Sequence, residues 1–416
     1  AHLLLGLYQP SPLDIDDLLD CKQLDVVHDL ALIFTDQLEE EIPRLLERIN
    51  KTDLTILAAF KNYDLDNDDR EKILEALIPV IQDASKKKTL ALKAFAKLYR
   101  KDEGYSKLLD KIKFDKKDFL DKITFYGQFV DKSVYTKNLY DDLKSNLDLI
   151  NEDTIKYALK IAITEKKARS IEILTHFIDS FPDESFKYYL LCARDCYRYI
   201  EPHVFREFAS VMQHETKEVR TNAIKYLTEA LNLPTTPIQF LGLFALSATD
   251  PNKKNTSEAK RQLEEAIIFR RRLMKRSKEY NIQIVPETAL PYLVNILAHH
   301  KDIEKDKPEL ATFSLYLRFF LTPLCASTSQ LSYIKDICTR YSLLDDIEEE
   351  YSKNSSDLFK LAFDIVDELG RGRAYDPNPV EIEFEYNKRY FKEPSDEKER
   401  LKQVYKQTDD VIKSPM

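Results

Sequence analysis

Glycine is scarce in this sequence, with only six among 416 residues. Phosphate-binding loops of nucleotide-binding α/β folds and tight turns between antiparallel strands both depend on glycine, which adopts backbone conformations that other residues avoid. The shortage therefore argues against these folds. It favours helices joined by short polar turns, and we expect an all-α protein.

Apolar residues recur at spacings of three and four from Leu3 to about Gly370, as in helices with one buried face. A helix pair with its links takes about 40 residues, which is the period of HEAT and armadillo repeats. The predicted helices cover residues 35–50, 53–60, 69–83, 88–99, 116–131, 136–148, 152–164, 167–180, 185–199, 202–213, 217–231, 237–248, 256–278, 287–299, 308–322, 328–340 and 356–369.

The clearest single repeat helix is Thr216–Leu231. Val219, Ala223 and Leu227 form its apolar stripe together with Leu231. Arg220 follows Val219, as in the second helix of a HEAT repeat, where it can reach a carboxylate of the neighbouring repeat. We predict a HEAT-repeat α-solenoid over residues 1–370, one continuous array and a fragment of a longer protein.

The pattern changes at residue 371. Pro377 and Pro379 break the helix, and beyond them apolar and acidic residues alternate with the period of an extended chain. We predict that residues 371–416 form an extended tail that packs on the solenoid, with its end partly disordered. The residues expected to make this contact are Phe384, Tyr386, Tyr390 and Phe391.

No catalytic signature is present in the sequence. It lacks the patterns of nucleophile elbows, zinc proteases and phosphate-binding loops, so we expect neither an enzyme nor a cofactor. Asp64–Glu75 resembles the start of a calcium loop, but Asp69 stands where the turn needs glycine. Cys192 and Cys196 could share a helix face, but no second Cys/His pair follows at zinc-finger spacing. No metal site is expected.

Two basic features are candidates for partner binding. Residues 253–278 hold ten Lys and Arg against three Glu, on a chain whose net charge is −9. This ridge, with Arg270, Arg271, Arg272, Lys275 and Arg276, could complement the dipole of a long helix or bind an acidic segment or a DNA backbone. The aromatic helix Phe186–Ile200 carries Arg194 and Arg198 and is either core or an interface.

Several motifs of the C-terminal half occur in the order found in one known family. In order, they are Ala248-Thr249-Asp250-Pro251, Ala259 and Leu263 before Arg270-Arg271, Pro291-Tyr292 before Leu297-Ala298-His299, Leu358–Val366, and Arg389-Tyr390-Phe391 with Pro394. They resemble the C-terminal HEAT region of the precocious dissociation of sisters family of cohesin-associated proteins, the fifth of its naming series. The resemblance covers about residues 205–395, and the Lys, Asn and Asp content suits a fungal member.

This resemblance implies a non-enzymatic cohesin regulator on chromosomes in the nucleus. Such proteins bind the kleisin subunit of cohesin, maintain sister chromatid cohesion and, with the wings-apart-like release factor, control cohesin release; they also help recruit the cohesin acetyltransferase. Two alternatives remain from the residues themselves: another HEAT adaptor of the transport or phosphatase type, and a solenoid that contacts DNA weakly through residues 253–278. No apolar run is long enough for a membrane span, so no membrane partner is expected.

Overall fold

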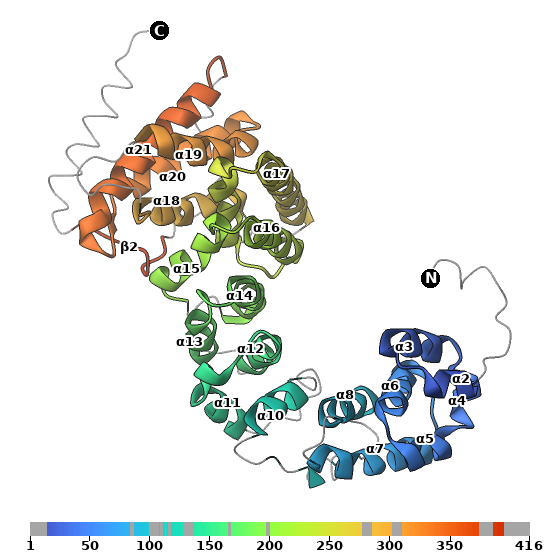
Figure 1. Cartoon of the computed structure of the whole chain (residues 1–416). Coiled ribbons are helices and arrows are strands. Elements are labelled where there is room, and N and C mark those ends of the chain that lie inside the picture. The colour runs from blue at the N-terminus through green and yellow to red at the C-terminus, as the bar shows by residue number, and fades with distance from the viewer. Residues whose placement is uncertain are drawn as a thin grey trace, which may run out of the picture. The chain divides into compact units, whose positions relative to one another are not determined.

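The computed structural model confirms the all-α, HEAT-type solenoid (Figure 1). The chain divides into two compact units, Ala1–Thr164 and Glu165–Met416. The single continuous array over residues 1–370 stays a prediction. The structure describes residues 15–83, 87–99, 108, 111–112, 114, 118–127, 137–164, 168–196, 200–276, 285–301, 310–373 and 386–394.

Unit 1 is a stack of short helices. α6 lies at its centre, buried from Thr52 to Ala59 and packed against α3 and α8. A reciprocal capping box starts α6, because Asn50 Oδ1 accepts from the backbone N–H of Asp53 and the Asp53 carboxylate accepts from that of Asn50. The described helices of unit 1 are α2 (Ile15–Asp20), α3 (Leu24–Ile33), α4 (Thr35–Glu39), α5 (Ile42–Arg48), α6 (Lys51–Ala59), α7 (Asn67–Gln82), α8 (Lys88–Leu98), α10 (Phe119–Tyr126), α11 (Lys137–Lys144) and α12 (Ile155–Thr164), with the 3-10 turns η1 (Phe60–Asn62) and η5 (Leu147–Leu149).

Unit 2 contains longer helices and one short strand pair. Its helices are α13 (Ala168–His176), α14 (Pro182–Cys196), α15 (Pro202–Ala209), α16 (Lys217–Leu231), α17 (Lys253–Arg276), α18 (Leu290–Ala298), α19 (Leu310–Leu324), α20 (Thr328–Tyr341) and α21 (Ser352–Leu369). The 3-10 segments are η7 (Ser210–Gln213), η8 (Ile238–Thr249), η10 (Pro286–Ala289) and η11 (Glu349–Tyr351), and the strands are β1 (Asp345–Asp346) and β2 (Phe391–Lys392).

The core of unit 2 surrounds η8, whose residues from Ile238 to Ser247 are all buried. It packs against α17, α18 and α19. Gly242 permits the approach of α18, because a Cβ at this position would lie 3.1 Å from that of Leu293. We predicted an α-helix over 237–248, but this run is a 3-10 helix. Because this run is apolar on every side, its pattern fits a helix with about 3.0 residues per turn as well as one with about 3.6. Its sequence therefore does not distinguish a 3-10 helix from an α-helix.

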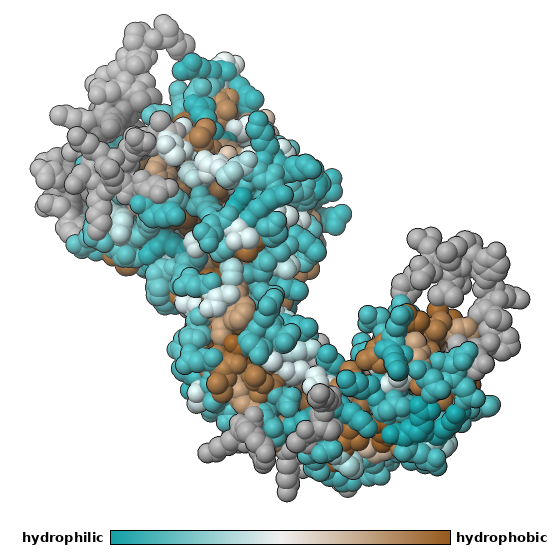
Figure 2. All heavy atoms as spheres, viewed as in Figure 1, coloured by the Kyte–Doolittle hydropathy of each residue, from teal (hydrophilic) through white to brown (hydrophobic). Residues whose placement is uncertain are grey.

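The described surface of unit 2 is mainly hydrophilic on the face seen in Figure 2, where polar residues cover α16 and α17. In unit 1, α3 instead exposes Val26, Leu32 and Ile33, each by more than 40%. Among the described residues, no helix is long and apolar enough to cross a membrane.

Candidate partner-binding surface

Helix α17 carries the basic ridge, and its two faces differ sharply. One face is buried at spacings of three and four and packs against η8 and α16. The buried residues are Asn255, Ala259, Leu263, Ala266, Ile267 and Arg270. The opposite face, which includes Arg261, Ile268 and Arg272, is exposed. The ridge therefore contains both interior and surface cations, and Lys278 lies outside the described residues.

Arg270 lies inside the protein and is 0% exposed. Its guanidinium donates to the carbonyl oxygens of Leu233 (3.3 Å), Pro234 (3.1 Å) and Thr236 (2.8 Å). Burial lowers the pKa of Arg270 to about 10, so the group stays charged at neutral pH. The prediction that Arg270 binds a partner is therefore wrong. Arg270 ties α17 to the segment that follows α16, and its buried side chain presents no surface to a partner.

Arg271 also points inward, with its side chain 22% exposed. Its Nη2 lies 3.0 Å from Glu287 Oε1 and 3.1 Å from the carbonyl oxygen of Leu324. Burial raises the pKa of Glu287, and the charge of Arg271 opposes that rise. Arg271 thus joins α17 to η10 and to the end of α19, and its charge is largely compensated within the protein.

Arg272, Lys275 and Arg276 are the exposed cations at the C-terminal end of α17. None of the three forms an ion pair with another described residue. Arg261, nearer the start of the helix, is compensated by Glu258 and Glu265 on the same helix. Positive charge at a helix C-terminus complements its dipole by about 0.3–1 kcal/mol. This trio, which we call the α17 cation cluster, is the part of the predicted ridge that faces solvent.

The aromatic helix α14 belongs mainly to the core. Tyr188 and Tyr189 are buried, and the Tyr189 ring stacks on Phe208. Arg194 is partly exposed, with its Nη2 3.9 Å from the carboxylate of Asp195. Arg198 lies outside the described residues. Only Arg194 of the two predicted arginines can therefore be placed.

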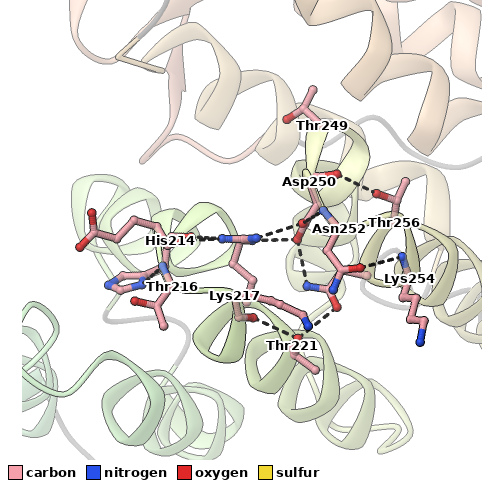
Figure 3. Close-up of polar contacts among 12 residues, drawn as sticks. His214, Thr216, Lys217, Thr221, Thr249, Asp250, Asn252, Lys254 and Thr256 are labelled. Carbon is pink, nitrogen blue, oxygen red and sulfur yellow. Dashed lines mark hydrogen bonds and ion pairs between the residues drawn. The ribbon is translucent and has the colours of Figure 1, made fainter.

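The predicted reach of Arg220 toward a neighbouring carboxylate is realised with Asp250, at the end of η8 (Figure 3). Nε and Nη2 of Arg220 bind the two carboxylate oxygens at 2.8 and 3.1 Å. Burial raises the pKa of Asp250, but hydrogen bonds from Arg220, from the Asn252 backbone and from Asn255 outweigh it and lower the pKa overall. This buried pair links α16 to the start of α17, which orients the ridge helix.

The tail lies on unit 2 through residues 386–394, which we call the tail segment. Tyr390 and Phe391 are 2% and 1% exposed. Tyr386 is partly exposed, and its hydroxyl donates to Glu393 Oε1 at 3.1 Å. Phe384 lies outside the described residues. β2 of the tail segment pairs antiparallel with β1, with Asp346 opposite Phe391 and Asp345 opposite Lys392.

Sequence reasoning missed a buried polar cluster around Asp346, which is 0% exposed. Its Oδ2 lies 2.9 Å from Asn295 Nδ2, 3.1 Å from His299 Nε2 and 3.1 Å from Ser355 Oγ. The cluster joins α18, β1 and α21. Asn295 and His299 lie 51 and 47 residues from Asp346 in the sequence, and the only signal was His299 at the end of the Leu-Ala-His motif.

The other sequence features considered as metal sites, the calcium-like stretch and the cysteine pair, belong to helices. Asp66 accepts from the backbone N–H of Asp68 and caps α7, so the calcium-like stretch begins a helix. Cys192 is buried, and the side chain of Cys196 is outside the described set. Within the described part of the chain, no group of three or more His, Cys, Asp and Glu residues could hold a metal ion.

Comparison with known proteins identifies part of this chain. Residues 189–376 match the family model described as "Sister chromatid cohesion protein PDS5 protein". Sister chromatid cohesion protein PDS5 homolog A-B of Xenopus laevis is 31% identical over 156 residues, which is 36% of this chain and 12% of that protein. Residues 189–376 are thus similar to the PDS5 family. Homolog A of Homo sapiens is 28% identical over 178 residues (41% of this chain, 13% of that protein), and the Dictyostelium discoideum homolog is 24% identical over 169 residues (38% and 11%).

The PDS5 match confirms the resemblance found from the motifs. It includes the second half of α14, all helices from α15 to α21, the Arg220–Asp250 pair and the α17 cation cluster. The tail segment lies beyond its last matched residue, and unit 1 lies before its first. The chain spans about an eighth of the length of these PDS5 relatives.

Proposed function

We propose that this chain is a non-catalytic scaffold of sister chromatid cohesion, which associates with cohesin on chromosomes in the nucleus. The observation that carries the proposal is the PDS5 match over residues 189–376, together with relatives named as sister chromatid cohesion proteins. A helical-repeat surface suits this role, because it offers a long preformed face to an extended partner.

In this proposal the direct partner is the kleisin subunit, and the release factor and the cohesin acetyltransferase act through the same scaffold. The exposed α17 cation cluster suits an acidic stretch of such a partner, because its charges are not compensated by described neighbours. Arg270 and Arg271 contribute indirectly, since their bonds to the segment after α16, to η10 and to α19 fix the helix that carries the cluster.

The test is a binding assay between the purified chain and cohesin's kleisin, beside a full-length PDS5 protein. We expect the triple variant Arg272→Glu/Lys275→Glu/Arg276→Glu to weaken binding while the thermal melt falls by only a few degrees, because the three charges lose their favourable interaction with the helix dipole. The matched control is Lys253→Glu/Lys254→Glu, which reverses exposed cations at the other end of α17. Failure of both the chain and the full-length protein to bind kleisin would defeat the proposal.

A second candidate function is a weak contact with the DNA backbone through the same cluster. Three cations that neutralise three phosphates give a slope of about −3 for the logarithm of affinity against the logarithm of salt concentration. Absence of duplex binding at low salt would eliminate this candidate and leave the kleisin proposal untouched.

A further inference from the structure

The tail segment is held on unit 2 in the way that a short peptide is held by a receptor. Its backbone extends the β1 strand, and the carbonyl oxygen of Tyr390 accepts from the N–H of Ile347 at 3.0 Å. Two consecutive aromatic side chains enter the body of the unit. Addition of a strand with side chains in separate recesses is a recurrent mode of peptide recognition.

The two aromatic rings occupy separate recesses. Tyr390 packs edge-to-face on Phe205 and Tyr292, with centroids 6.4 and 5.0 Å away. Phe391 packs on Tyr341 and Phe359, with centroids 5.0 and 6.0 Å away. The four lining residues belong to α15, α18, α20 and α21, and with β1 they form what we call the tail groove.

The tail groove is built by the body of unit 2. Phe205 also packs on Phe240 of the central η8 segment, and Tyr341 stacks on Phe359 across α20 and α21. β1 is anchored from behind by the buried carboxylate of Asp346, through its contacts with α18 and α21. These contacts do not involve the tail segment, so we expect the groove to keep its shape when that segment leaves.

Basic side chains on both sides of the aromatic pair also contact the body of unit 2. Arg389 donates to the carbonyl oxygen of Ile200 at 3.2 Å and to Glu201 Oε1 at 3.4 Å, and Lys392 pairs with Glu349. Both carboxylates are well exposed, at 54% and 76%. Exposed ion pairs contribute about 0–1 kcal/mol each. They therefore select basic residues on both sides of the aromatic pair without holding the segment tightly.

The recess of Tyr390 does not satisfy its hydroxyl. The Oη atoms of Tyr390 and of Tyr189 are both buried, and neither has a hydrogen-bond partner among the described residues. Burying an unpaired hydroxyl is unfavourable by about 1–3 kcal/mol. A ligand with phenylalanine at this position fills the same recess without that penalty.

We propose that the tail groove is a peptide-binding site that the chain's own tail segment occupies at rest. It accepts from a partner protein an extended peptide with a basic residue, two consecutive aromatic residues and a second basic residue. The tail segment then acts as a competing internal ligand, which a partner must displace. This site is separate from the α17 cation cluster, and the proposal does not rest on cohesin binding.

The test uses the whole 416-residue chain and a fluorescein-labelled peptide that reproduces residues 386–394, with binding followed by fluorescence anisotropy. The variant Tyr390→Ala/Phe391→Ala empties both recesses. We expect it to bind the peptide at least ten times more tightly than the unaltered chain does. A peptide with alanine in place of both aromatics should not bind, and a peptide with phenylalanine for the tyrosine should bind about ten times more tightly.

A second variant covers the case in which the first one fails to fold. The variant Arg389→Ala/Lys392→Ala keeps both aromatic rings and removes only the polar contacts of the two basic side chains. It should also bind the peptide more tightly than the unaltered chain does. Equal binding by all three chains would show that the peptide uses another surface and would overturn the proposal. So would absence of binding by a variant whose thermal melt shows that it is folded.

Discussion

Replacing Arg270 with alanine tests the interior role of this residue against the surface role that its sequence context suggests. Arg270 and Arg272 lie two residues apart in one basic run, yet the first is 0% exposed and the second faces solvent. The matched variant Arg272→Ala therefore removes the same side chain from the same helix without touching the interior.

The expected loss follows from the contacts of the guanidinium. Arg270→Ala leaves three carbonyl oxygens, of Leu233, Pro234 and Thr236, without their charged donor. Each such bond contributes about 1.5–3 kcal/mol, offset in part by the unfavourable burial of the charge. The truncated side chain also leaves a cavity. We expect the free energy of unfolding to fall by about 3–5 kcal/mol, against about 0.5 kcal/mol or less for Arg272→Ala.

Differential scanning calorimetry and hydrogen exchange measure this difference. For a unit of this size, such a loss lowers the melting temperature by about 10 °C. Amides of α17 and of the end of α16 should exchange faster in Arg270→Ala and at the normal rate in Arg272→Ala. Identical melts for the two variants would refute the interior role and restore Arg270 to the surface ridge.

Three further predictions concern other buried groups. Asp250→Asn should lower the free energy of unfolding by about 3 kcal/mol at pH 7, because it leaves Arg220 buried without its counter-charge. The pKa of Asp250 is lowered from 3.8, so the stability that its charge contributes is fully present above pH 3.8 and is lost as the pH falls through the lowered pKa. Urea titrations should therefore show that the free energy of unfolding depends less on acidic pH in the variant than in the unaltered chain. Tyr390→Phe should leave stability unchanged or raise it by about 1 kcal/mol in chemical denaturation, and a clear loss would show that the hydroxyl is hydrogen-bonded. Burial raises the pKa of the Cys325 thiol to about 12, so mass spectrometry after iodoacetamide treatment at pH 8 should find half-buried Cys21 modified and Cys325 intact; early modification of Cys325 would contradict its burial.

Much of the fold was predictable because helical periodicity records which face of each helix is buried. The helix from Lys217 to Leu231 matches its predicted range, and Arg220 reaches the carboxylate that its position suggested. The 3-10 segment η8 was not predictable as such, since its residues are apolar on every side. The predicted helix over 35–50 is instead two helices, α4 and α5, with Pro43 in the first turn of the second.

The candidate surface was less predictable because charge does not reveal burial. Arg270 occupies the same stripe as Ala259, Leu263 and Ile267, at helical spacing, and that alignment could have placed it inside. The Asp346 cluster depends on the contacts of Asp346 with Asn295 and His299, which are far from it in the chain. No local sequence pattern indicates such contacts, whereas Tyr390 and Phe391 could be recognised in the sequence as consecutive aromatic residues.

Binding of the purified chain to cohesin's kleisin subunit tests the central proposal most directly. Isothermal titration calorimetry with purified kleisin, run beside a full-length PDS5 protein, provides the measurement. A cohesin scaffold should give a saturable 1:1 isotherm, weakened by charge reversal at Arg272, Lys275 and Arg276. No heat of binding from either protein, with both folded by their thermal melts, would contradict the account.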